Sequence, residues 1–236
     1  MHARVGEGGR LLGLAALYVV FARLGLSLGP VAGFATLVWP PTGIAIAGLL
    51  LLGIRAWPGV FIGAVAANLL TGASAAVALG IAIGNTTEAV VCVCIVNRLS
   101  DFSIRLENAR SVVWLMFGAL AGTMLSAAIG VASLYIGGAI GAAQWRETWR
   151  AWWIGDMVGA LVVAPVILVW SRPAGPRFAP GKVESAAIAI AVVVVSAATF
   201  LATSRSYPAC RLRSTRLTSS WPCWYGRRSA EGSEGP

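Results

Sequence analysis

The sequence predicts an all-α protein, a polytopic transmembrane helical bundle of about seven spans. Hydrophobic residues make up 58% of the chain and charged residues only 11%, which is too little charged surface for a soluble domain of this length. The hydrophobic residues also form long runs divided by short connections, as membrane-crossing helices do. A formal net charge of +9 would suit nucleic acid, but the arginines lie between the apolar runs and in a C-terminal tail, where membrane orientation places them. We therefore expect the lipid bilayer, and no nucleic acid, as a partner.

A polar cytoplasmic leader, residues 1–10, comes first, and the membrane domain covers residues 11–203. The first apolar run is long and no small-residue cleavage site follows it, so we expect it to stay as an anchor. The third run is short, and a tilted span, a re-entrant hairpin and a buried helix all fit it, because a full crossing takes about 20 residues. The predicted spans are residues 11–28, 37–54, 57–71, 75–96, 112–138, 151–170 and 185–203, with an interfacial segment at 144–150.

Positive charge is divided unevenly between the connections. With the N-terminus inside, the outer connections hold only Arg146 and Arg150. This asymmetry predicts a multi-pass protein with a cytoplasmic N-terminus. Arg23, near the end of the first span, either snorkels outward, which we favour, or pairs with a carboxylate in the bundle. The inner cations are Arg4, Arg10, Arg55, Arg98, Arg105, Arg110, Arg172, Arg177 and Lys182.

Residues 204–236 form a basic tail that breaks this pattern. Its composition changes from Ala, Val, Ile and Gly to Arg, Ser, Pro, Trp and Cys, and six arginines fall on the outer side, which should be poor in them. Our hypothesis is an altered reading frame or a truncated gene that begins near Tyr207. The alternative is a genuine disordered basic tail.

The stretch Trp39-Pro40-Pro41-Thr42-Gly43 opens the second apolar run. Prolines are tolerated at a helix start, where the first backbone donors lack partners anyway, and tryptophan favours the membrane interface. One interpretation is therefore an ordinary span start. The other is a pre-shaped wall of a ligand cavity, because irregular backbone near the membrane is tolerated best where protein or a water-filled cavity covers it.

Several polar side chains lie inside the predicted spans, where placing a polar group in hydrocarbon costs free energy. Asn85 and Glu88 are three residues apart and so share a helix face, and Asp156 follows a pair of tryptophans. One interpretation is a polar ligand pocket with tryptophan walls, in which Glu88 and Asp156 are charge or proton partners. The other is hydrogen bonding that holds helices together; for the two acids we favour function. The candidate ligand-binding residues are Trp39, Pro40, Pro41, Thr42, Asn68, Asn85, Glu88, Trp153 and Asp156.

Small residues recur every four positions in two predicted spans. At that spacing they clear one helix face for close contact with another helix, which concerns packing and not chemistry. The residues are Gly118, Gly122, Ser126 and Gly130 in one span and Gly155 and Gly159 in the next.

No catalytic constellation is recognisable. The only histidine is His2, so no histidine-based triad or metal site can be assembled. Cys92 and Cys94 point to different faces of one helix and suit neither zinc nor a mutual disulfide. We expect no enzyme, no cofactor and no metal.

Seven motifs follow one another along the chain: Trp39-Pro-Pro-Thr-Gly-Ile, Leu49-Leu-Leu-Leu-Gly, Ala56-Trp-Pro-Gly-Val-Phe-Ile-Gly-Ala, Ala67-Asn, Ile83-Gly-Asn-Thr-Thr-Glu-Ala, Trp152-Trp-Ile-Gly-Asp and Ala164-Pro. Together they resemble the bacterial membrane-associated sensor (MASE) family, the first of its numbered group. The resemblance implies an integral sensing domain of about eight helices in the bacterial inner membrane. It also implies fusion at the cytoplasmic end to a diguanylate cyclase, phosphodiesterase or histidine kinase module. The expected eighth span and the module are missing from this chain, and the tail stands in their place.

The first functional hypothesis is a sensory input domain that detects a small ligand or a state of the membrane and reports to a separate or lost cytoplasmic signalling module. The alternative is a small-solute transporter or channel that uses Glu88 and Asp156. A third class is a passive bundle that only anchors, or that forms a homodimer through the face from Gly118 to Gly130.

Overall fold

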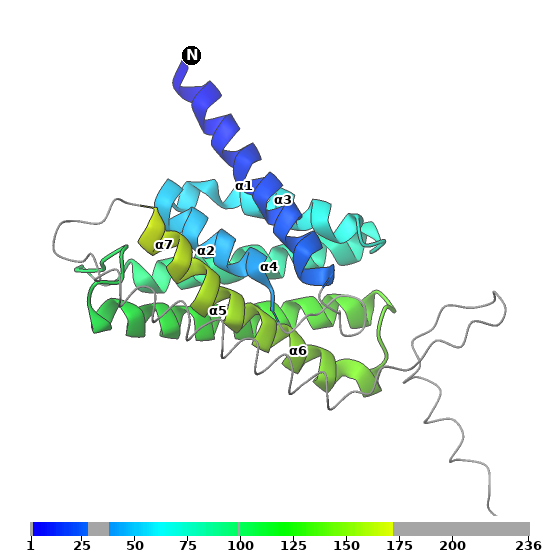
Figure 1. Cartoon of the computed structure of the whole chain (residues 1–236). Coiled ribbons are helices and arrows are strands. Elements are labelled where there is room, and N and C mark those ends of the chain that lie inside the picture. The colour runs from blue at the N-terminus through cyan, green and yellow to red at the C-terminus, as the bar shows by residue number, and fades with distance from the viewer. Residues whose placement is uncertain (1, 28–37, 99, 172–236) are drawn as a thin grey trace, which may run out of the picture. The chain divides into compact units, whose positions relative to one another are not determined.

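The computed structural model describes residues 2–27, 38–98 and 100–171. All regular secondary structure in these ranges is helical, which confirms the predicted all-α class (Figure 1). The predicted span at 185–203, the tail at 204–236 and the cations Arg172, Arg177 and Lys182 lie outside the described residues. The elements are α1 (His2–Ser27), α2 (Pro40–Leu52), η1 (Ile54–Ala56), α3 (Trp57–Leu69), α4 (Ala75–Val96), α5 (Ala109–Ile136), η2 (Ala142–Gln144), α6 (Trp145–Val158), η3 (Gly159–Val163) and α7 (Ala164–Trp170).

Four helical stretches in the described residues are long and apolar enough to cross a membrane: Gly6–Leu26, Ala75–Val96, Ala109–Ile136 and Ala142–Trp170. The helices α2 and α3 have only 13 residues each. At about 1.5 Å per residue each is roughly 20 Å long, short of the roughly 30 Å hydrocarbon core. The predicted count of seven spans is therefore not confirmed, and the second run is shorter than the full crossing expected over residues 37–54.

The helices α6 and α7 form one continuous rod through the π-helical turn η3. Pro165 lacks a backbone N–H and its ring crowds the carbonyl four residues earlier. The chain accommodates this with a wider turn, in which the Ala164 N–H bonds to the Gly159 carbonyl, five residues back. The predicted interfacial segment at 144–150 is helical and belongs to α6, which begins at Trp145. In the stretch Ala142–Trp170, which is long enough to cross a membrane, Asp156 lies near the middle and not one turn from the start.

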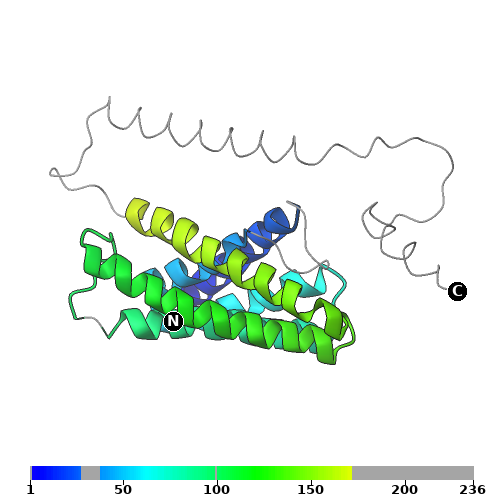
Figure 2. The same cartoon turned by 90° about the horizontal axis from the view of Figure 1, so that it is seen from below.

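The short helix α2 lies inside the bundle. It packs against α1, α4, α6, η3 and α7, while α4 and α5 lie side by side as the most extensive helix pair (Figures 1 and 2). Of the 13 residues of α2, nine are buried, so it is a core helix that the other helices enclose. The buried side chains along the helix contacts are mostly small, which lets backbones approach closely. Examples are Ala45, Ala47, Ala64, Ala82, Ala119 and Ala160.

Large apolar side chains point outward from the helices. A soluble monomer rarely exposes so much continuous apolar surface, whereas a bilayer requires it. The most exposed include Leu12, Val20, Ile62, Phe117 and Ile136.

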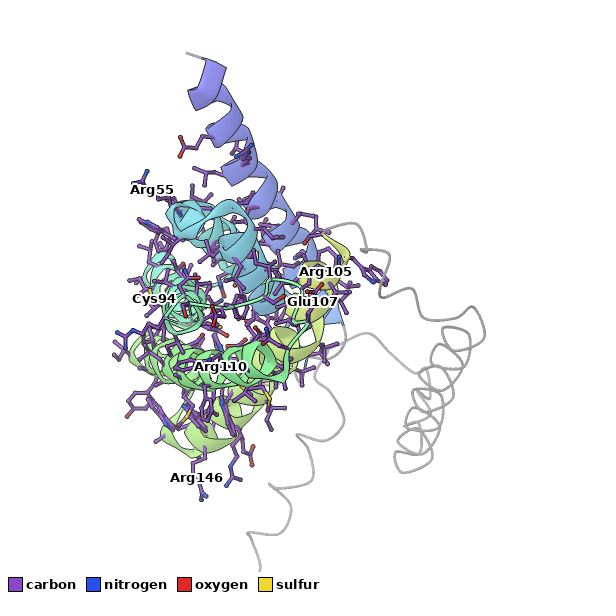
Figure 3. All side chains as sticks on the ribbon, turned by 90° about the vertical axis from the view of Figure 1, so that its left-hand side faces the viewer. Arg55, Cys94, Arg105, Glu107, Arg110 and Arg146 are labelled. Atoms are coloured by element: carbon purple, nitrogen blue, oxygen red, sulfur yellow. The ribbon has the colours of Figure 1, made fainter. Side chains whose placement is uncertain are left out.

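Several of the described arginines lie at one end of the bundle. Figure 3 views that end, where Arg55 joins α2 to α3 and where Arg105 and Arg110 precede and open α5. Arg105 Nε lies 3.2 Å from Glu107 Oε1. Arg146 lies in the first turn of α6, beyond the far end of α5. Arg23, at the α1 C-terminus, is bonded through Nη1 to the Leu70 carbonyl at 3.4 Å, at the end of α3.

Candidate functional site: a buried polar cluster

Six polar side chains from five helices form a buried polar cluster: Tyr18 of α1, Thr42 of α2, Asn85 and Glu88 of α4, Ser126 of α5 and Asp156 of α6. None is more than 3% exposed. Apart from Thr42, each lies near the middle of one of the four helical stretches long enough to cross a membrane. The polar cluster therefore sits where an unsatisfied polar group is most expensive.

The start of α2 is fixed to α6 beside the polar cluster. The Trp39 amide donates to the Gly155 carbonyl at 3.0 Å, and the Thr42 hydroxyl donates to Asp156 Oδ1 at 3.1 Å. Pro40 and Pro41 occupy the first two helical positions and are buried. Trp39 is also buried against protein, with 9% exposure. The helix begins inside the bundle, and its first turn forms one wall of the polar cluster.

A hydrogen-bonded chain joins three further helices. The Asn85 amide nitrogen donates to the Tyr18 hydroxyl at 2.7 Å, and the Ser126 hydroxyl donates to Asn85 Oδ1 at 3.0 Å. The sequence analysis did not single out Tyr18, and it assigned Ser126 only to packing. A signal for Tyr18 was present, because it carries the only hydroxyl between residues 11 and 26, and a buried tyrosine usually finds a hydrogen-bond partner.

Neither carboxyl oxygen of Glu88 forms a hydrogen bond of normal geometry with the described residues. Glu88 is 1% exposed, and its carboxyl group interacts with Asp156, Ser126 and Thr42. Asp156 Oδ2 likewise lacks a hydrogen-bond partner of normal geometry in the part of the chain that the structure describes. The ion pair in the described residues joins Arg105 to Glu107, outside the polar cluster. Among the same residues, no arginine or lysine forms an ion pair with Glu88 or Asp156. Two acids without a nearby cation are expensive to bury, which makes the polar cluster the candidate functional site.

Glycines bring backbone directly against the polar cluster. A Cβ on Gly122 would lie 2.6 Å from the Glu88 carbonyl oxygen, and a Cβ on Gly118 would lie 2.9 Å from the Cys92 carbonyl oxygen. A Cβ on Gly130 would lie 2.7 Å from the Trp152 ring. This face of α5 is therefore occupied within the chain, by α4 and α6, and is not free for the homodimer considered from the sequence.

Glycines also allow close backbone contact between the start of α2 and the α6–η3 segment. A Cβ on Gly159 would overlap the Trp39 carbonyl oxygen, and a Cβ on Gly43 would overlap the Gly159 carbonyl oxygen. Gly155 accepts the hydrogen bond from the Trp39 amide. Both glycines of the α6–η3 pair therefore contact the α2 start.

Two candidate ligand-binding residues, Asn68 and Trp153, belong neither to the polar cluster nor to the α2 start beside it. The Asn68 amide donates to the Ala64 carbonyl of its own helix at 2.8 Å. Trp153 stacks on Trp149, with ring centroids 5.6 Å apart, in a separate hydrophobic group. The tryptophan that contacts Asp156 is instead Trp152, one helical turn away on the same face.

A groove between α3 and α4 opens outward, away from the hydrogen bonds of the polar cluster. Its volume is about 350 Å³ and its lining is mainly apolar. The lining residues are Trp57, Phe61, Ile83, Thr86, Thr87 and Val90.

The fold and the site together define a helical membrane domain with an acidic polar cluster at its centre. The MASE1 family model matches residues 10–213. The chain therefore belongs to the MASE1 family of membrane-associated sensor domains, which confirms the resemblance found in the motifs. The match ends within the basic tail. Neither the curated proteins nor the solved structures include a match to this chain.

Proposed function

We propose that this chain is the sensory input domain of a bacterial signal-transduction protein, and that the polar cluster is its detecting element. The observation that carries the proposal is Glu88, an acid buried where α4 meets α2, α5 and α6, with neither oxygen hydrogen-bonded in the described residues. Ionisable residues inside a membrane are retained for function, because hydrocarbon penalises them. Family membership supports a sensory role over other roles of a buried acid.

The proposed stimulus is a small ligand or a state of the membrane that changes the packing around Glu88. The rod formed by α6, η3 and α7 supports this mechanism. It holds Asp156 near its middle and ends at Trp170, at the end of the bundle where Arg55 and Arg110 lie. A displacement of Asp156 would be transmitted along a continuous helix to that end, because a packed helix moves as a unit.

The arginine-rich end is the proposed cytoplasmic side of the inner membrane, which also makes the N-terminus cytoplasmic. The proposed receiver there is a diguanylate cyclase, phosphodiesterase or histidine kinase module. In this proposal the chain itself catalyses no reaction.

Hydrogen–deuterium exchange of the whole chain in lipid nanodiscs tests the proposal. The panel varies small solutes and the proportion of anionic lipid, and the readout is exchange in α4 and in the α6–α7 rod. We expect at least one condition to change exchange in both regions of the wild type and of Glu107→Gln, whose carboxylate is exposed, but not of Glu88→Gln. Identical exchange across the panel would contradict a sensory role.

The second candidate is transport of a small solute, because the two buried acids would also suit proton-coupled movement. Flux of solute into reconstituted vesicles that disappears in Glu88→Gln would favour transport. Condition-dependent exchange without flux would favour sensing.

A further inference from the structure

We propose that Glu88 and Asp156, with the hydroxyl oxygens of Thr42 and Ser126, form a binding site for one monovalent cation, either a proton or a sodium ion. The inference names a ligand class for the detecting element, and it rests on the proposed function only for its consequence in signalling. Binding of the cation can be measured without any output module.

The hydrogen bonds around Glu88 leave acceptors and no hydroxyl hydrogen for it. A hydroxyl has a single hydrogen to donate. The Thr42 hydrogen goes to Asp156 Oδ1, and the Ser126 hydrogen goes to Asn85 Oδ1. With their hydrogens placed in these two bonds, the hydroxyls of Thr42 and Ser126 turn lone pairs towards Glu88.

Three carboxyl oxygens complete this arrangement. Both oxygens of Glu88 and Oδ2 of Asp156 are buried without a hydrogen-bond partner in the described part of the chain. Carboxylate and hydroxyl oxygens are the ligands that hard cations prefer, and a proton between two carboxyl groups uses the same lone pairs. What the arrangement lacks is a positive charge.

The neighbours of Glu88 do not supply that charge. The titratable groups that interact with it are Asp156 of α6, Tyr18 of α1 and Cys92 of its own helix. The contacts from α5 and α2 are Ser126 and Thr42, which are neutral. No arginine or lysine within the described ranges forms an ion pair with either acid.

The start of α2 balances part of the negative charge. Thr42 lies in the first turn of α2, and a helix N-terminus carries roughly half a positive charge. Two ionised carboxylates would still leave an excess of more than one negative charge in a low-dielectric interior, which is expensive. One bound monovalent cation removes most of that excess.

The test measures thermal unfolding of the purified whole chain, followed by tryptophan fluorescence. One series replaces choline chloride with sodium chloride at constant ionic strength and alkaline pH, and the other lowers the pH without sodium. Because a ligand that binds the folded state stabilises it by mass action, we expect the unfolding midpoint to rise in at least one series. A rise with sodium identifies the metal ion. A rise with acid alone identifies the proton, since a folded state that binds more protons than the unfolded chain loses stability as pH increases.

Glu88→Gln provides the decisive variant, because glutamine has the same shape and no charge to balance. It should unfold near the midpoint of the cation-loaded wild type and respond to neither series. Glu107→Gln, which alters the exposed ion pair with Arg105, should respond as the wild type does. An unchanged wild-type midpoint in both series, or a full response in Glu88→Gln, would overturn the proposal.

Infrared difference spectroscopy of the wild type covers the case in which Glu88→Gln does not fold. Sodium binding should shift the carboxylate stretching bands, and proton binding should produce the carbonyl stretch of a protonated carboxyl group. A spectrum without either change would also overturn the proposal. Failure of the cation site would leave solute- or lipid-dependent hydrogen exchange unaffected, so the two proposals fail separately.

Discussion

Gly122→Ala tests whether the contact between α4 and α5 holds the polar cluster in place. A Cβ at this position would lie 2.6 Å from the Glu88 carbonyl oxygen, whereas ordinary contact begins at 3.4 Å. The obstacle is backbone and cannot rotate away, so the two helices would have to separate by about 0.8 Å, the difference between those two distances. Overpacking of this kind costs about 1–3 kcal/mol, and replacing glycine by alanine in a helix returns about 0.5–1 kcal/mol. We expect a net loss of about 1–2 kcal/mol in the free energy of unfolding.

Gly13→Ala is the matched control for this prediction. Gly13 lies on the exposed face of α1, and nothing lies within 4 Å of its added Cβ. The same substitution there should leave stability unchanged or raise it by about 0.5–1 kcal/mol. Unfolding of the two variants in one detergent compares them directly. If Gly122→Ala were as stable as Gly13→Ala, α5 would not press on the Glu88 backbone and the packing argument would be refuted.

Three further substitutions probe the hydrogen bonds and the α2 contact. Thr42→Val keeps the side-chain shape but leaves Asp156 without its hydroxyl donor, so the free energy of unfolding should fall by about 1–3 kcal/mol in thermal denaturation; an unchanged midpoint would contradict the bond. Tyr18→Phe removes the hydroxyl that accepts the Asn85 amide bond, and the free energy of unfolding should fall by about 1 kcal/mol in the same measurement. An unchanged free energy of unfolding would show that this bond is absent. Gly159→Ala places a methyl group on the Trp39 carbonyl and should speed hydrogen exchange in the first turn of α2; exchange at the wild-type rate would show that the α2 start does not touch η3.

The membrane class and most helix positions could be predicted from the sequence because long apolar runs report directly on helices that face lipid. The run at 75–96 is identical in prediction and structure. The polar residues Asn85, Glu88 and Asp156 could also be selected in advance, since a polar group in an apolar run stands out and is costly there. These residues could be chosen without a structure because their cost in an apolar span can be estimated from the sequence alone.

The position of α2 could not be predicted from the same signal. Its sequence is as apolar as that of a membrane crossing, yet its 13 residues form a helix enclosed by other helices. Burial against protein and burial in lipid select the same residue types, so hydropathy does not distinguish them. The burial of Trp39 follows from that packing, which bonds Trp39 to Gly155, a residue on another helix and far away in the sequence.

The start of α2 lies inside the bundle and is bonded to α6. Its contacts there are the Trp39–Gly155 and Thr42–Asp156 hydrogen bonds. Both bonds end on α6, within two residues of one another. A change in the charge of Asp156 would alter the Thr42 bond directly, and α2 would then shift against η3, where the Gly43–Gly159 contact leaves no free space. The rod that contains η3 would have to move with it, which links a charge at the polar cluster to α7 through two packed helices.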